Sequence, residues 1–230
     1  MISKKLQDAF NEQMKNEFFS AYLYKAMVAY FDWMKGHTQK EDKVPGRGVG
    51  KVDPKIVPNV ANGEKVYGAQ CAVCHGQNGE GVLTQGGSQY GPALTDVGAA
   101  AVDFQVGTGR MPMAQPGVQA PRKEVVYTKE ETAALAAYVA SLGTGPAVPD
   151  KELYSTEGMS QKEIEALVVR GGQIFLANCT ACHNFEGSGG AMPRGGFAPK
   201  IRGVDSKHIY EAMLTGPQSM DTFSDGNIPP

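Results

Sequence analysis

The four cysteines of the chain occur as two pairs, and each pair is followed directly by a histidine. The first pair lies in Cys71-Ala72-Val73-Cys74-His75 and the second in Cys179-Thr180-Ala181-Cys182-His183. Both segments read C-x-x-C-H, the signature for covalent attachment of c-type haem. The two thiols add to the vinyl groups of the porphyrin, and the histidine is the proximal ligand of the iron. The sequence therefore predicts two covalently bound haem c groups, one at each segment.

Two other kinds of site also use paired cysteines. A thioredoxin-like redox pair is a C-x-x-C motif, but it needs no trailing histidine and belongs with a βαβ pattern that is not visible here. A four-cysteine zinc site usually has its halves within about 20 residues, whereas Cys74 and Cys179 are 105 positions apart (179 − 74). Because two copies both end in histidine, haem attachment is the favoured interpretation.

Methionines that could serve as the sixth iron ligand follow the two motifs at similar distances. Met111 lies 36 residues after His75 (111 − 75), and Met220 lies 37 residues after His183 (220 − 183). A thioether in this position raises the reduction potential of the haem. We predict that Met111 and Met220 are the axial ligands, with Met113 as an alternative to Met111.

A proline follows each motif in a similar context, in Tyr90-Gly91-Pro92 and in Phe197-Ala198-Pro199. In small c-type cytochromes the carbonyl of such a proline accepts a hydrogen bond from the proximal histidine, which orients the imidazole and raises its basicity. We assign this role to Pro92 and Pro199, and the alternative is an ordinary turn proline. An internal repeat of cysteines, histidine, proline and methionine in one order predicts two haem modules.

The elements expected around these motifs are helices and Gly-rich loops. Helices are predicted over 63–70, 98–106, 128–142 and 161–177, and the residues between Gly76 and Tyr90 are expected to form a loop. Thr128 and Glu131 have the spacing of a capping box. In small cytochromes c the helix that this box begins packs on the helix before the haem. No counterpart follows Met220 in the sequence, so the second module is expected to lack its closing helix.

Residues 2–35 are predicted to form one amphipathic helix, because apolar side chains recur at i, i+4 spacing. Its segment Glu17-Phe18-Phe19-Ser20-Ala21-Tyr22-Leu23-Tyr24 resembles the first helix of bacterial and archaeal ferritins. In that family the glutamate matching Glu17 is an iron ligand. A di-iron site also needs Glu-x-x-His pairs from other helices, which this sequence lacks, so we interpret Glu17 as a surface or helix-pairing residue.

Composition limits the possible locations and partners. The 230 residues carry a formal net charge of −2, which argues against a nucleic-acid partner. No apolar run reaches the roughly 20 residues that span a bilayer, and no secretory signal is visible. Covalent haem attachment generally takes place outside the cytoplasm, so we expect a location on the extracytoplasmic face of the cell membrane. The export signal or anchor is expected outside this sequence.

From Gly63 onward the sequence resembles the dihaem c-type cytochrome subunit of the actinobacterial cytochrome bcc complex, a menaquinol–cytochrome c reductase that pairs with an aa3 oxidase. The resemblance rests on segments that include 102–113, 182–191 and 212–220. It implies that one haem takes electrons from a Rieske iron–sulfur centre and that the other passes them to the oxidase. It also implies cytochrome b as a partner and membrane association through the complex or through an anchor. The family usually has Asn-Met-Pro at the second axial methionine, where this chain has Ser219-Met220-Asp221.

The predicted fold class is all-α, with two tandem cytochrome c-type haem domains preceded by a long amphipathic helix. The predicted divisions are a ferritin-like helix at 1–36, a linker at 37–60, the first cytochrome domain at 61–146, a linker at 147–162 and the second domain at 163–230. The predicted function is single-electron relay, with no catalysis by the chain alone. The alternative is a peroxidase-like dihaem enzyme with one open haem site. Such an enzyme would need a nearby acid–base pair, and neither of the spare histidines, His37 and His208, has a motif around it.

Overall fold

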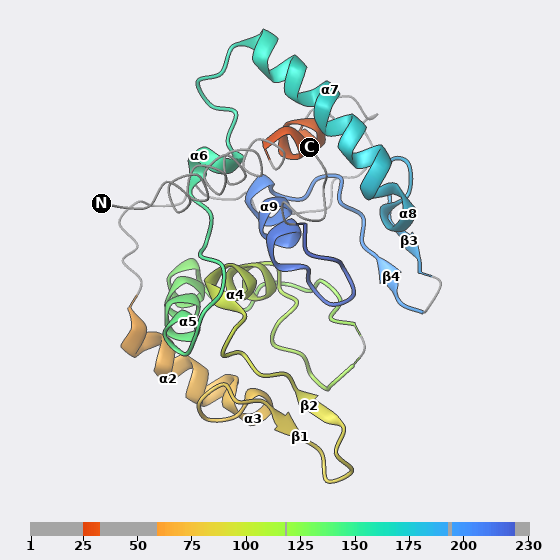
Figure 1. Cartoon of the computed structure of the whole chain (residues 1–230). Coiled ribbons are helices and arrows are strands. Elements are labelled where there is room, and N and C mark those ends of the chain that lie inside the picture. Colours follow the sequence, from red (N-terminus) through yellow and green to blue (C-terminus); the bar gives the residue numbers. More distant parts are fainter. Residues whose placement is uncertain (1–24, 33–58, 118, 193–194, 224–230) are drawn as a thin grey trace, which may run out of the picture. The chain divides into compact units, whose positions relative to one another are not determined.

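The computed structural model describes residues 25–32, 59–117, 119–192 and 195–223, and it divides into two compact units (Figure 1). The first unit comprises Thr38–Val148, and the second combines Met1–His37 with Pro149–Pro230. The described residues are mostly helical, with two small antiparallel strand pairs, which confirms the predicted fold class. No helix among them is long and apolar enough to cross a membrane.

The first unit consists of four helices and one strand pair within its described residues. They are α2 (Val60–Gln70), α3 (Ala72–His75), β1 (Val82–Leu83), β2 (Gln89–Gly91), α4 (Gly98–Gly107) and α5 (Lys129–Ser141). The helices lie within one or two residues of their predicted limits at most ends. The short pair β1–β2 lies where the sequence predicted only a loop, because strands of two and three residues leave no readable alternation.

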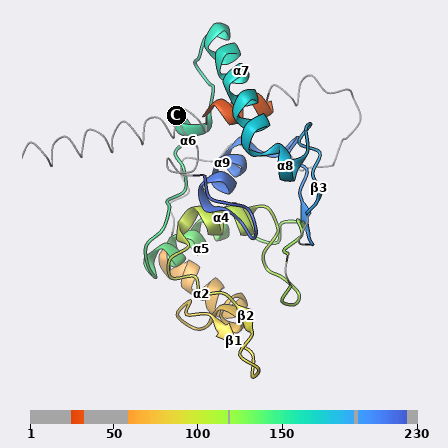
Figure 2. The same cartoon turned by 45° about the vertical axis from the view of Figure 1, so that its right-hand side comes forward.

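Helix α2 lies beside α5 in both views of the molecule (Figures 1 and 2). A Cβ atom added to Gly63 would lie 2.0 Å from the carbonyl oxygen of Ala134 and 2.8 Å from the Cβ of Tyr138. The rings of Tyr67 and Tyr138 are 5.0 Å apart between centroids. Glycine at position 63 therefore allows the two helices to approach closely. The buried core around this crossing consists of Tyr67, Ala72, Val102, Val106, Leu135, Ala136, Tyr138 and Val139.

Reciprocal hydrogen bonds fix the starts of α5 and α7, the two longest helices among the described residues. Thr128 and Glu131 form the predicted capping box at the start of α5. Ser160 and Glu163 form a second box at the start of α7, which was not predicted from the sequence. Each box satisfies backbone N–H groups that the first turn of a helix leaves without partners.

From α7 to α9 the second unit repeats the order that the first unit has from α2 to α4, and two further helical pieces, the segment 25–32 and α6, precede these elements. Its elements are the helical segment 25–32, α6 (Lys151–Tyr154), α7 (Gln161–Asn178), α8 (Thr180–His183), β3 (Gly190–Ala191), β4 (Phe197–Ala198) and α9 (Ser206–Thr215). Helix α7 matches the prediction over 161–177. The helix predicted over 2–35 is described only at 25–32, and Glu17 lies outside the described residues.

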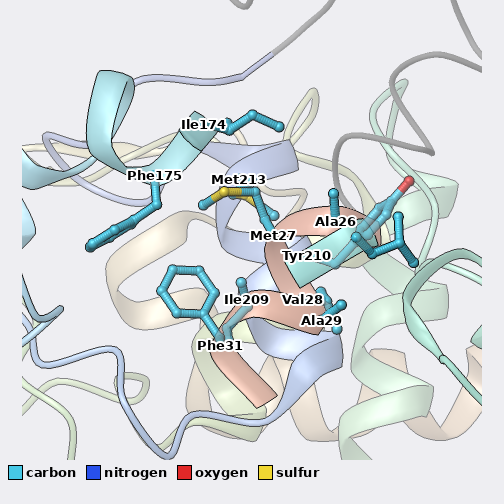
Figure 3. Close-up of a cluster of buried hydrophobic side chains, with 11 residues drawn as sticks. Ala26, Met27, Val28, Ala29, Phe31, Ile174, Phe175, Ile209, Tyr210 and Met213 are labelled. Carbon is cyan, nitrogen blue, oxygen red and sulfur yellow. The ribbon is translucent and has the colours of Figure 1, made fainter. Parts of the chain in front are cut away.

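The segment 25–32 belongs to the core of the second unit. Its side chains Met27 and Phe31 are each 2% exposed and lie among side chains from α7 and α9 (Figure 3). The ring of Phe31 meets that of Phe175 edge-on, with centroids 5.4 Å apart. Apolar burial of this kind is the main source of stability for a short helix.

Candidate haem attachment sites

The first C-x-x-C-H motif sits where α2 ends and the single turn α3 begins. The backbone N–H of Cys71 donates to the carbonyl of Tyr67 at 2.8 Å, which closes α2. The N–H of His75 donates in turn to the carbonyl of Cys71 at 2.9 Å. Cys71, Cys74 and His75 are thereby held on one turn of helix, and both thiols are free.

The His75 ring is oriented by the backbone of the proline singled out in the sequence. Its Nδ1 lies 2.7 Å from the carbonyl oxygen of Pro92. A carbonyl only accepts hydrogen bonds, so Nδ1 must carry the proton, and the lone pair of the neutral ring is then on Nε2. Such a bond fixes the tautomer and the orientation of a ligating histidine.

Gly91 allows the Pro92 carbonyl to reach this position, a role that was not predicted from the sequence. A Cβ atom at position 91 would lie 1.9 Å from the carbonyl oxygen of Cys74, so β2 runs directly against the motif. In the second unit the matching position is Ala198, whose side chain is accommodated. Only the first unit therefore requires glycine here.

We expect Gly91→Ala to destabilise the first unit by about 1–3 kcal/mol, the usual cost of overpacking a tight contact. The added methyl group has to push β2 away from the carbonyl of Cys74, and with it the Pro92 carbonyl. The measurement is thermal unfolding followed by circular dichroism. Gly86→Ala is the matched control, because the nearest atom to a Cβ there is 3.9 Å away. Equal stability of the two variants would contradict the expected clash.

The second motif has the same local geometry at the junction of α7 and α8. The N–H of Cys179 donates to the carbonyl of Phe175, and the N–H of His183 donates to that of Cys179, both at 2.9 Å. The Nδ1 of His183 lies 2.9 Å from the carbonyl oxygen of Pro199. Burial lowers the pKa of His183, and the bond to Pro199 opposes this shift. The net direction favours the neutral imidazole, which is the form that binds iron.

The thiols differ from those of a redox-active pair. Burial raises the pKa of Cys71 to about 11 and that of Cys179 to about 12. The first cysteine of a thioredoxin-like pair instead has a lowered pKa, because the thiolate is its reactive form. The environment of these cysteines therefore argues against the redox-pair alternative.

Tyr67 connects the core of the first unit to the end of the motif. Its hydroxyl donates to the carbonyl of Gly76 at 2.7 Å in a buried position, and burial raises its pKa to about 12. The hydroxyl thus fixes the chain immediately after His75. This role was not predicted from the sequence, although Tyr67 stands in α2 four positions before the first cysteine of the motif.

We expect Tyr67→Phe to lower the free energy of unfolding of the first unit by about 1–2 kcal/mol, because the buried Gly76 carbonyl loses its hydroxyl donor. Chemical denaturation of the purified chain measures the change. Tyr90→Phe removes a hydroxyl from an exposed side chain and should change stability by less than about 0.5 kcal/mol. A Tyr67→Phe variant as stable as the Tyr90→Phe variant would show that the bond contributes nothing.

The methionines predicted as axial ligands are partly buried. Met111 packs against the core of the first unit, and its N–H donates to the carbonyl of Gln105 at 2.9 Å. Met220 packs against the core of the second unit, and its N–H donates to the carbonyl of Pro217 at 3.1 Å. Met113 is also half-buried. Ligation by Met111, Met113 or Met220 stays a prediction.

The residues of each motif fit a haem c group by their chemistry. Two free thiols lie on one helical turn, and the imidazole that follows has its Nδ1 engaged, so that Nε2 is the nitrogen left for a metal. These are the donors required for two thioether links and one proximal ligand.

Comparison with known proteins agrees with this geometry. The family model for cytochrome c matches residues 60–143 and 168–215, which include both motifs. The chain is 44% identical over 180 residues to the cytochrome bc1 complex cytochrome c subunit of Corynebacterium efficiens, covering 74% of this chain and 58% of that protein. The proteins of the same name from Corynebacterium diphtheriae (41% over 176 residues, 74% and 61% covered) and Mycobacterium bovis (41% over 169 residues, 72% and 57% covered) are similar.

The chain spans about three fifths of the length of these relatives. The cytochrome c model, by contrast, matches more than half of the chain itself and includes both attachment motifs. The similarity to the relatives extends across both units as well. The chain therefore belongs to the cytochrome c family.

Proposed function

We propose that the chain binds two haem c groups covalently and relays single electrons between partner proteins. The observation that carries the proposal is the repetition of one arrangement, in which a histidine next to two free thiols has its Nδ1 on a proline carbonyl, at 2.7 Å in the first unit and 2.9 Å in the second. A bound haem supplies one-electron redox chemistry, and the chain supplies attachment, orientation and shielding from water.

Each set of residues has a distinct role in this proposal. Cys71 and Cys74 hold the first group, and Cys179 and Cys182 hold the second. His75 and His183 provide the proximal nitrogens, whose basicity is raised by donation from Nδ1 to Pro92 and Pro199. Met111 and Met220 are proposed as the opposite ligands, which would favour the ferrous state and raise the potential.

The relatives are named as cytochrome c subunits of cytochrome bc1 complexes, which supports a place for this chain in a complex of that kind. We place this chain in a quinol–cytochrome c reductase, beside cytochrome b and a Rieske protein. It would receive electrons from the Rieske iron–sulfur centre and pass them to an aa3-type terminal oxidase. Its working position would be the extracytoplasmic face of the membrane.

A stoichiometric test of the proposal starts with the purified, haem-loaded chain. A pyridine haemochrome spectrum normalised to protein is expected to give two haem c groups per chain. Rapid mixing with a reduced Rieske domain under anaerobic conditions should then reduce both haems, and subsequent mixing with an aa3-type oxidase should reoxidise them.

The contrary outcome is equally well defined. An open sixth site on one haem together with peroxide turnover would replace electron relay with the peroxidase-like alternative. The proposed partner would be contradicted if the Rieske domain reduced the haems no faster than a chemical reductant of equal potential does. A His75→Ala, His183→Ala double variant serves as the control without proximal ligands.

A further inference from the structure

The segment 25–32 packs on α7 in the same way as α5 packs on α2. A Cβ atom added to Gly171 would lie 2.0 Å from the carbonyl oxygen of Ala26 and 2.8 Å from the Cβ of Tyr30. The corresponding distances for Gly63 are 2.0 Å to Ala134 and 2.8 Å to Tyr138. In both units the glycine allows one helix to approach the backbone of another that presents alanine and tyrosine four positions apart.

The two glycines occupy the same position relative to the haem motifs. Gly63 lies eight residues before Cys71 (71 − 63), and Gly171 lies eight before Cys179 (179 − 171). An aromatic residue follows each glycine four positions later and meets the tyrosine of the partner helix. The ring centroids are 5.0 Å apart for Tyr67 with Tyr138 and 5.6 Å apart for Phe175 with Tyr30.

The sequences of the two partner helices also correspond. Residues 26–31 read Ala-Met-Val-Ala-Tyr-Phe, and residues 134–139 read Ala-Leu-Ala-Ala-Tyr-Val. The apolar positions beside the matched residues are buried in both helices, with exposed fractions of 2% for Met27 and 1% for Leu135. Figure 3 shows Met27 and Phe31 facing Phe175 of α7 and Met213 of α9.

Polar contacts hold the segment 25–32 at both ends. The Nζ of Lys25 donates to the carbonyl of Glu152 in α6 at 3.3 Å. The hydroxyl of Ser206, at the start of α9, donates to both carboxylate oxygens of Asp32, at 2.9 and 3.1 Å. The segment is therefore fixed in position along α7 and α9 by directional bonds as well as by apolar burial.

We infer that the segment 25–32 is the closing helix of the second cytochrome unit, so that a stretch of chain preceding the first unit completes the second. The N-terminal region, whose sequence resembles a ferritin helix, thus supplies a structural element of the second cytochrome unit. The segment shields the end of α7 that leads into Cys179, as α5 does for α2 and Cys71. This inference concerns the folding of the second unit and does not depend on the electron partners proposed above.

Hydrogen–deuterium exchange on the full haem-loaded chain tests the inference directly. Amides of 26–32 are expected to exchange as slowly as those in the middle of α7. Gly171→Ala is expected to accelerate exchange in 26–32 by about 10- to 100-fold, the equivalent of the usual overpacking cost, and to leave α5 unchanged. Gly63→Ala is expected to do the reverse, with faster exchange in α5 and no change in 26–32.

Three further variants keep the test decisive if Gly171→Ala does not fold. Gly68→Ala is the matched control, because a Cβ at this position of α2 has no neighbour within 4 Å, and it should leave both closing helices protected. Ser206→Ala removes only the hydroxyl bonds to Asp32 and is expected to accelerate exchange in 26–32 by about tenfold. Thr144→Ala removes a hydroxyl hydrogen bond to Asp96 in the first unit and should leave exchange in 26–32 unchanged.

Three exchange results, and one result from light scattering, would overturn the inference. The first is that the amides of 26–32 are unprotected in the unaltered chain. The second is that both Gly171→Ala and Ser206→Ala leave exchange in 26–32 as in the unaltered chain. The third is that Ser206→Ala and Thr144→Ala accelerate exchange in 26–32 equally. A dimer in light scattering whose dissociation exposes 26–32 would assign the contact to a second copy and would contradict closure within one chain.

Discussion

The double variant Cys179→Ala, Cys182→Ala is expected to carry half the haem of the unaltered chain, one group instead of two. Both cysteines are needed for thioether links, and the motif around Cys71 lies in a unit with its own core and its own His75–Pro92 bond. The first unit should therefore still take up its haem. The measurement is the pyridine haemochrome absorbance per mole of protein, with haem staining of a denaturing gel.

The reciprocal variant Cys71→Ala, Cys74→Ala is the control for this result. It should also retain one haem, now attached to the second unit through Cys179 and Cys182. Peptide mass spectrometry identifies which segment carries the group. Complete loss of haem from either double variant would show that the two units do not mature independently, and an unchanged content of two would exclude attachment at the altered motif.

Met111→Ala is expected to lower the midpoint potential of one haem by on the order of 100 mV, a fraction of the roughly 0.8 V range that axial ligands cover. As the proposed sixth ligand, the Met111 thioether would favour the ferrous state, and its replacement by water or a harder ligand would remove that preference. The same variant should lose about half of the weak red absorption band that marks methionine–iron ligation. Potentiometric titration with optical detection measures both effects.

Met113→Ala distinguishes the two candidates in the first unit. Both methionines are half-buried, but Met111 is the one that packs against the core. We therefore expect Met113→Ala to leave the potential and the red band unchanged. A large shift in the Met113 variant together with a normal Met111 variant would transfer the ligand role to Met113. Met220→Ala should affect the other haem by a similar amount.

The chemistry of the two attachment sites could be predicted from the sequence because it is local. The two cysteines and the histidine of each motif lie within five consecutive residues, and one helical turn is enough to bring them together. The capping box at Thr128 was readable for the same reason, since its two partners are three residues apart. Local patterns of this kind need no knowledge of the rest of the fold.

The tertiary structure determined which distant backbone groups support these motifs. Pro92 and Pro199 stood out in the sequence, but their distances to His75 and His183 depend on how the loops fold back. The need for glycine at position 91 follows only from the packing of β2, because a Cβ atom there would lie 1.9 Å from the carbonyl oxygen of Cys74. A single glycine in a Gly-rich loop carries no such information in the sequence.

Only the tertiary structure shows that the helical segment 25–32 is the one that packs on α7. In the order of the repeat, the closing helix of the second unit would follow Met220. The structure instead packs 25–32 on α7, with Ala26 and Gly171 in contact across 145 positions (171 − 26). The pattern Ala-x-x-Ala-Tyr is too short and too common to identify a partner helix by itself. Helix pairing is decided by the complementary surfaces of both helices, and sequence order places no limit on which helix supplies the second one.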